Sequence, residues 1–435
     1  MGILFLAALY VSASANAIPE QPVAVSAVTA QGVVITTVQA PPPAPALPTT
    51  LVADNPAPHI ALLLPLKSKS TELANYAKVV QQGFSAAAAV QQGLPVRVYA
   101  SSEEPKEVVA LYRQAITNGA LAVAGPLTRD GVATLAAYPG ITVPTLALNT
   151  SELPNQTNQL YFFGLPAENE ARQIAQIAAL SGLRDATVVT TNTAISKRLA
   201  AAFADEWTKL GGALTAEVVF KGDSTVITKL PVAPWPEGTE PQPASAVSET
   251  GEPLPPGRPL PPPIAPGNMV FLATDHDKAR RIRPYLNPGL PVYATSLLFK
   301  GNTNQQLANY DLNEIRFVDM PWLLQPDHPA VMIYPRAETA LEPEEDRLYA
   351  MGIDAYRLVH ILLTRHAESG LPLDGVTGRI SLNRLQFQRE GLAAFFRIGL
   401  GLTADTLAAL NAAKAAAKEA AEQASNVEIT PSPAP

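Results

Sequence analysis

The sequence predicts an α/β protein with two mainly parallel sheets. Short, continuous apolar runs, such as Ile-Ala-Leu-Leu-Leu at 60–64, alternate with amphipathic helical segments, and the alternation starts again after Gly164. A strand that is apolar throughout is typical of a parallel sheet covered on both faces, and alternating strands and helices indicate βαβ units. The 435 residues are enough for two domains or two lobes of this kind.

The first half of this pattern begins with the run at 60–64. Pro65 ends the strand, a polar loop follows, and apolar residues at helical spacing begin at Leu73. Ser70 or Thr71 is the expected cap of that helix. The same criteria predict strands at 96–100, 121–124, 145–148 and 160–163, and helices at 106–117 and 132–137.

The second half repeats the theme. A helix ends at Gly211 and Gly212, because glycine readily adopts the conformation that terminates a helix. Two late strands, at 378–382 and 392–398, are expected to pair and close the fold. The other expected elements are strands at 186–190, 218–220, 269–273, 291–294 and 314–319 and helices at 171–181, 196–210, 277–285 and 344–363.

Four further segments are expected outside this α/β framework. Residues 1–17 combine a short apolar run with Ala15-Asn16-Ala17, which predicts a signal peptide, although an apolar N-terminal strand is the alternative. Residues 18–56 are expected to be a disordered tether rich in Pro, Ala and Val. Residues 231–266 hold 13 prolines, which favours a disordered insertion, either a spacer or a docking segment. An alanine-rich helix at 401–425 and a disordered tail at 426–435 follow.

Composition limits the classes of function. Hydrophobic residues make up 47% and charged residues 16% of the chain, so a large core can be buried. The formal net charge of -7 argues against a nucleic-acid partner, which would need a basic face. The sequence contains no cysteine, which excludes thiol catalysis, disulfides, thiolate metal sites and a lipidation cysteine. No run approaches the 18 apolar residues of a membrane helix.

The sequence shows no known catalytic motif. The five histidines lack the spacing of a zinc hydrolase, and no nucleophile elbow or phosphate-cradling loop is present. Gly399-Leu-Gly401 is similar to part of a dinucleotide fingerprint, but no further βαβ unit follows it. We therefore expect a protein that is not an enzyme and has no cofactor and no metal.

Two polar loops are the best candidates for a binding site. Thr128 and Arg129 follow the strand at 121–124, and Asn149, Thr150 and Ser151 follow the strand at 145–148. Open α/β sheets bind ligands at the carboxyl ends of their strands. Hydroxyl groups and an arginine there suit a carboxylate of a ligand or partner. As the alternative, Thr128 and Ser151 cap a helix and a turn.

Several motifs resemble those of one family, the LppC/LpoA-type penicillin-binding protein activators. They are Ile60-Ala-Leu-Leu-Leu-Pro-Leu, Ala124-Gly-Pro-Leu, Pro144-Thr-Leu-Ala-Leu-Asn149, Arg347-Leu-Tyr-Ala-Met-Gly-Ile-Asp-Ala-Tyr-Arg-Leu358 and Leu373-Asp-Gly-Val-Thr-Gly-Arg-Ile-Ser-Leu382. The similarity covers about residues 57–400, and the last two motifs are the specific ones.

The resemblance implies a fold of two doubly wound lobes of type I periplasmic binding-protein architecture joined by three crossings. We place the crossings near Gly164, near Met320 and near 371–376, so that lobe 1 comprises 57–164 with 320–372. Lobe 2 then comprises 165–319 with 373–400.

The resemblance also implies a function. It predicts a periplasmic regulator that binds and activates a peptidoglycan synthase. An ABC-transporter-type solute-binding protein for a small amino-acid-like or amide ligand is the alternative. The loop at 190–195 lacks the aromatic residue usual in amino-acid-binding relatives, which weakens that alternative.

Overall fold

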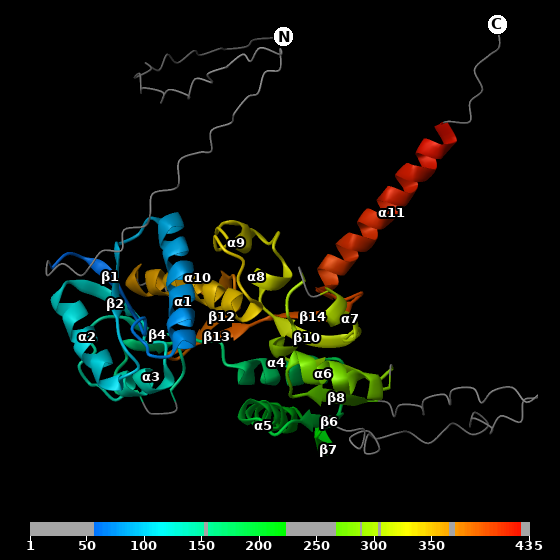
Figure 1. Ribbon diagram of the computed structural model, residues 1–435, viewed down its shortest axis with the longest axis horizontal. Helices are drawn as coiled ribbons and strands as arrows, with labels where there is room; N and C mark the ends of the chain where they lie inside the picture. The colour runs from blue at the N-terminus through cyan, green and yellow to red at the C-terminus, as the bar shows by residue number, and fades with distance from the viewer. Residues whose placement is uncertain are drawn as a thin grey trace, which may run out of the picture. The chain divides into compact units, whose positions relative to one another are not determined.

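The computed structural model describes residues 56–151, 155–222, 267–287, 289–302, 306–364 and 370–427. All of them belong to one compact unit, which contains two sheets with their helices (Figure 1). The expected signal peptide, the tether up to residue 55, the proline-rich insertion and the tail from residue 428 lie outside the described residues. Within the described part, no helix has both the length and the apolar character needed to cross a bilayer.

The first sheet has eight strands among the described residues, in the order β11-β12-β13-β5-β4-β3-β1-β2. Strands β1 to β5 are parallel, β13 joins β5 in parallel, and β12 pairs antiparallel with both β11 and β13. The bounds are β1 His59–Leu64, β2 Val96–Ala100, β3 Ala120–Ala124, β4 Thr145–Ala147, β5 Leu160–Phe162, β11 Leu373–Gly375, β12 Gly378–Asn383 and β13 Gln386–Glu390.

Strand β1 is buried on both faces, as its apolar run predicted. Ile60 and Leu62 belong to the core shared with α1 (Thr71–Gln91) and α10 (Pro343–Thr364). Ala61 belongs to the opposite core, with α2 (Pro105–Thr117) and α3 (Arg129–Ala136). Successive side chains of a strand point to opposite faces, so an uninterrupted apolar sequence fits a doubly covered sheet.

Helices α1 and α10 cross at two glycines. A β-carbon on Gly83 would lie 1.9 Å from the carbonyl oxygen of Tyr349, and one on Gly352 would lie 2.2 Å from that of Val80. A side chain at either position would force the helices apart, so this close approach requires glycine.

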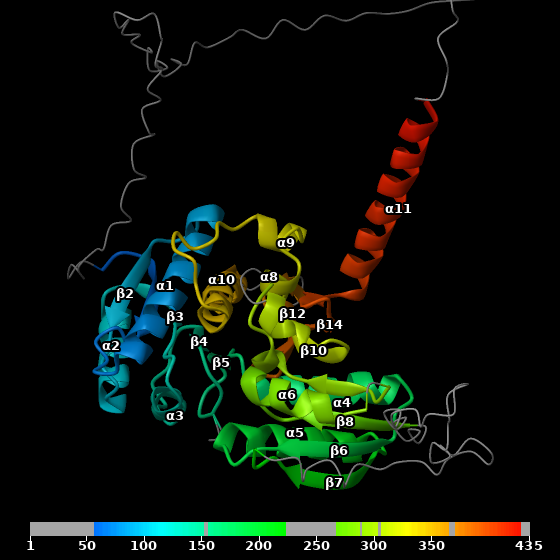
Figure 2. The same ribbon diagram turned by 45° about the vertical axis from the view of Figure 1, so that its right-hand side comes forward.

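The second sheet has seven strands in the described part of the chain, in the order β15-β14-β10-β9-β8-β6-β7. Figure 2 shows β8, β6 and β7 side by side at one end of it. One face is covered by α4 (Ala167–Leu180) and α5 (Ala194–Lys209), and the other by α6 (His276–Ile282). The bounds are β6 Asp185–Thr190, β7 Ala213–Val219, β8 Asn268–Leu272, β9 Val292–Ala294, β10 Ile315–Asp319, β14 Leu392–Arg397 and β15 Leu400–Leu402.

The chain passes between the two sheets three times. It does so between β5 and α4, between β10 and α8 (Pro321–Leu324), and at Gly391 between β13 and β14. The remaining helices are α7 Gln306–Tyr310, α9 Pro329–Met332 and α11 Ala404–Val427, with 3-10 turns at Arg283–Tyr285 and Ser296–Leu298.

Two expectations about the C-terminal strands are wrong. Residues 373–390 belong to the first sheet, so the third crossing lies at Gly391 instead of near 371–376, and only the strands after it join the second sheet. The segments at 378–382 and 392–398 do not pair with each other. Strand β12 pairs instead with β13 through a turn in which Arg384 has a positive φ of 58°, and β14 pairs with β10.

Candidate functional site

A polar cleft of about 630 Å³ lies between the two lobes. Its walls come from the start of α3, the loop after β4, the first turns of α4, α5 and strand β13. The residues that line it are Arg129, Asp130, Ala133, Thr150, Ser151, Pro166, Glu168, Asn169, Arg172, Arg198, Gln386 and Gln388.

Three of the five predicted site residues line this cleft, namely Arg129, Thr150 and Ser151. Thr128 is instead the cap of α3, and its hydroxyl accepts a hydrogen bond of 3.2 Å from the backbone N–H of Gly131. The side-chain amide of Asn149 donates to the carbonyl oxygen of Leu127 at 3.0 Å. Thr128 and Asn149 therefore shape the two loops that carry the lining residues.

The rest of the lining comes from residues that sequence reasoning missed. Arg172 on α4 donates to the side-chain oxygen of Asn169 at 2.8 Å, and Gln388 belongs to β13. Arg198 on α5 forms an ion pair of 2.6 Å with Glu168. The first of these residues, Glu168, lies 17 positions after Ser151, the last predicted one, and no local motif marks them.

The charge of the cleft is not evenly balanced. Partial burial of Glu168 favours its neutral form, but the hydrogen bonds that it accepts and the charge of Arg198 outweigh this effect, so its pKa is lowered. Its charge is thus already engaged by Arg198. Among the described residues, neither Arg129 nor Arg172 has a carboxylate within ion-pair distance. Their guanidinium groups can bind an incoming carboxylate.

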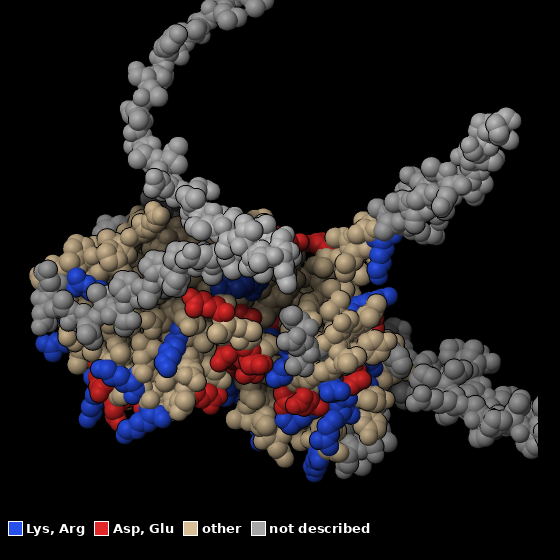
Figure 3. All heavy atoms as spheres, turned by 45° about the horizontal axis from the view of Figure 1, so that its top comes forward, with Lys and Arg blue, Asp and Glu red and all other residues tan. Residues whose placement is uncertain are grey.

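The face drawn in Figure 3 lacks the basic stripe of a nucleic-acid-binding surface. Figure 3 shows basic and acidic side chains interspersed over the face that it draws. A nucleic-acid interface would instead gather lysine and arginine along one face. Within the described residues, no three His, Cys, Asp or Glu side chains are grouped so that they could hold a metal ion.

A model of the family described as "LppC putative lipoprotein" matches residues 46–395. The chain belongs to the LppC family. This LppC-family chain is 27% identical over 381 residues to the penicillin-binding protein activator LpoA of Yersinia pseudotuberculosis serotype O:1b (strain IP 31758), covering 74% of this chain and 57% of that protein. It is 28% identical over 304 residues to the LpoA of Edwardsiella piscicida, covering 66% and 43%. The chain thus spans about half the length of these curated relatives.

Solved structures show the same fold. "LpoA (YraM) C-domain from Haemophilus influenzae, a regulator of PBP1A" matches with a TM-score of 0.60 and 21% identity, covering 79% of this chain and 99% of that one. A "putative branched-chain amino acid ABC transporter" from Chromobacterium violaceum matches with a TM-score of 0.62 and 33% identity, covering 78% and 100%. The predicted type I periplasmic binding-protein architecture is confirmed.

Proposed function

We propose that this LppC-family chain is a non-enzymatic regulator that binds and activates a peptidoglycan synthase of the penicillin-binding protein class. The observation that carries the proposal is the family match, which extends over most of both lobes. The curated relatives in that family are named as penicillin-binding protein activators. The absence of known catalytic motifs from the sequence agrees with a role in regulation.

The proposed location is the periplasm. The family description as a lipoprotein supports a place in the bacterial envelope. The apolar run and the Ala15-Asn16-Ala17 motif support export through a signal peptide.

The second candidate function is that of a solute-binding protein for an amino acid or an amide. The specific observation in its favour is the match to the Chromobacterium violaceum protein, whose title names a transporter. The loop after β6, from Thr191 to Ala194, contains no aromatic side chain that could pack on such a ligand. We therefore favour the regulator.

Within the cleft we propose that Arg129, Thr150 and Ser151 contact the ligand or partner, while Thr128 and Asn149 hold their loops in place. Replacing Arg129 with alanine removes a charge-assisted hydrogen bond, typically worth about 1.5–3 kcal/mol, so affinity should fall about tenfold to a hundredfold. Folding should be almost unchanged, because Arg129 is exposed. Arg113→Ala, an exposed arginine on α2 outside the cleft, is the matched control. Early melting of Arg129→Ala with unchanged binding would show that the residue is structural.

One pair of measurements separates the two functions. Thermal unfolding is followed with each of the common amino acids, and binding to a purified penicillin-binding protein is measured on immobilised chain. A ligand present at about 100 times its dissociation constant stabilises a protein by about 2.7 kcal/mol, which gives a clear shift. The regulator predicts synthase binding without a selective amino-acid shift. A selective shift without synthase binding would establish the receptor instead.

A further inference from the structure

Arg347 links the two lobes near the crossings of the chain between them, which act as the hinge. It lies on α10 of the first lobe and forms an ion pair with Asp319, at the end of β10 in the second, with N–O distances of 3.1 Å and 2.6 Å. Its Nη2 also donates to the carbonyl oxygens of Ser296 and Phe299, at 3.0 Å and 2.9 Å. Asp319 is completely buried and Arg347 is only 9% exposed. Burial opposes the charge of Arg347, but the Asp319 carboxylate outweighs it, so the pKa of Arg347 is raised.

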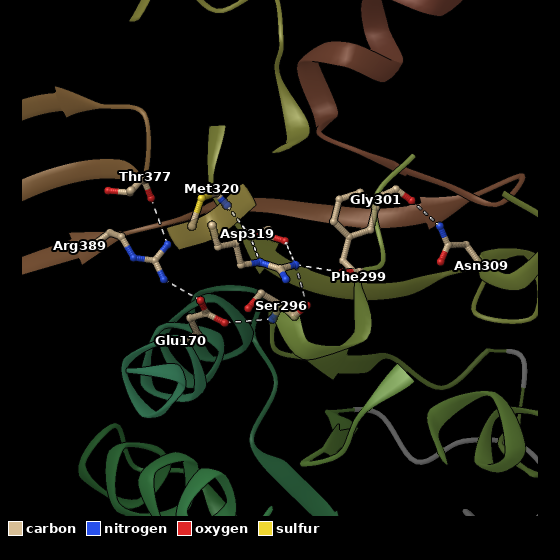
Figure 4. Close-up of polar contacts among 10 residues, drawn as sticks. Glu170, Ser296, Phe299, Gly301, Asn309, Asp319, Met320, Thr377 and Arg389 are labelled. Carbon is tan, nitrogen blue, oxygen red and sulfur yellow. Dashed lines mark hydrogen bonds and ion pairs between the residues drawn. The ribbon is translucent and has the colours of Figure 1, made fainter. Parts of the chain in front are cut away.

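A second buried ion pair joins the lobes beside the first. Glu170 on α4 of the second lobe accepts a hydrogen bond of 2.6 Å from Arg389 on β13 of the first lobe (Figure 4). Its other oxygen accepts from the backbone N–H of Ser296 at 3.0 Å, and Arg389 also donates to the carbonyl oxygen of Thr377 at 3.0 Å. Ser296 is therefore held by Arg347 through its carbonyl and by Glu170 through its N–H.

A change in lobe closure would have to disturb these contacts. Rotation about the crossings would pull Arg347 from the Ser296 and Phe299 carbonyls, and a buried charge that loses its partners is strongly disfavoured. A ligand can shift such an equilibrium only by its difference in affinity for the two closures. These contacts therefore favour one fixed arrangement of the two lobes.

The cleft beside these ion pairs is lined by three arginines, Arg129, Arg172 and Arg198, and by two carboxylates, Asp130 and Glu168, so its lining carries a net positive charge. Arg129 belongs to the first lobe and Arg172 to the second. Glu168 forms its ion pair with Arg198, and although the charge of Arg129 also helps to lower the pKa of Glu168, neither Arg129 nor Arg172 has a carboxylate within ion-pair distance among the described residues. The chain as a whole carries a net charge of -7, so attraction of an acidic molecule must be local to this cleft. A volume of about 630 Å³ leaves room for several residues of an extended segment.

We propose that the cleft is a preformed docking groove of fixed width for an acidic peptide segment of a protein partner, gripped by Arg129 and Arg172. In this proposal the two lobes do not close around a free solute. This inference rests on the proposed function, because it assigns the partner's segment to the same cleft.

The first test measures the distance between the lobes. Because the sequence has no cysteine, spin labels can be placed at Lys106→Cys on α2 and Asp205→Cys on α5, both exposed. Pulsed electron paramagnetic resonance should give one narrow distance that stays unchanged with hexaglutamate or with any common amino acid. Arg389→Met should broaden it. A distance that shortens with a free amino acid would overturn this inference, and the proposed function would fall with it only if the chain also failed to bind a synthase.

The second test measures binding of fluorescein-labelled hexaglutamate by anisotropy at low salt, with hexalysine as the control peptide. Arg172→Gln should weaken hexaglutamate binding at least tenfold, whereas Arg316→Gln, an exposed arginine of the second lobe outside the cleft, should leave it unchanged. Equal binding by wild type and Arg172→Gln, or no binding at all, would overturn the inference. If a synthase still binds the chain in that case, the proposed function stands without this groove.

Discussion

Replacement of Arg347 by methionine removes the buried contacts of Arg347 that link the two lobes, and it is the most direct test of them. Methionine keeps much of the side-chain length but leaves the Asp319 carboxylate buried, and the N–H of Met320, at 2.8 Å, is then its only donor within the described part of the chain. The carbonyls of Ser296 and Phe299 also lose their guanidinium donor. Breaking a buried pair by removing one partner typically costs about 3–5 kcal/mol, and we expect a loss of unfolding free energy in that range.

Urea unfolding followed by tryptophan fluorescence measures this loss, since Trp322 and Trp207 are both buried. The double variant Arg347→Met with Asp319→Asn should be more stable than the sum of the single losses predicts, because it leaves no unpaired charge. Arg397→Met is the control, since its ion pair with Glu314 is exposed and should contribute less than about 1 kcal/mol. If Arg347→Met lowers the free energy of unfolding by no more than the control does, the Arg347 contacts do not hold the two lobes together.

Three further predictions concern stability. Gly352→Ala should lower the unfolding free energy in urea by about 1–3 kcal/mol, because its methyl group would collide with the Val80 carbonyl; an unchanged midpoint would contradict this packing. Thr128→Ala should cost about 1 kcal/mol through loss of the α3 cap, and Thr128→Ser should retain it. Burial lowers the pKa of His59, although its hydrogen bond to the Ala57 carbonyl acts the other way. The unfolded state then binds the proton more readily, so His59 contributes stability that is complete above about pH 6.5 and is lost as the pH falls through the lower folded pKa. His59→Gln should flatten that loss, and an equally steep loss would exclude His59 as its source.

Local patterns were sufficient to predict most of the α/β framework. The apolar run of β1 indicated burial on both faces, and the alternation after Gly164 indicated a second sheet. The sheet to which a late strand belongs is not encoded locally. Residues 386–390 read Gln-Phe-Gln-Arg-Glu, and only their pairing with β5, more than 200 residues earlier, places them in the first sheet.

Some residues of the candidate site could likewise be predicted from local sequence, and others could not. Arg129, Thr150 and Ser151 follow strands whose ends could be located from the sequence. Arg172 and Arg198 face them only because the second lobe folds back against the first, and both positions look like ordinary exposed helix positions in the sequence. Thr128 shows that a polar residue in such a loop can serve the helix cap instead.

The central claim is activation of a peptidoglycan synthase, and a direct measurement of synthase rate tests it best. A purified bifunctional penicillin-binding protein is assayed for glycan polymerisation and cross-linking with increasing amounts of the full chain. The account predicts a saturable rise in rate that Arg129→Ala shifts to higher chain concentration and Arg113→Ala does not. Measured binding with no change in either rate, or no binding by any synthase of the same cell envelope, would contradict it.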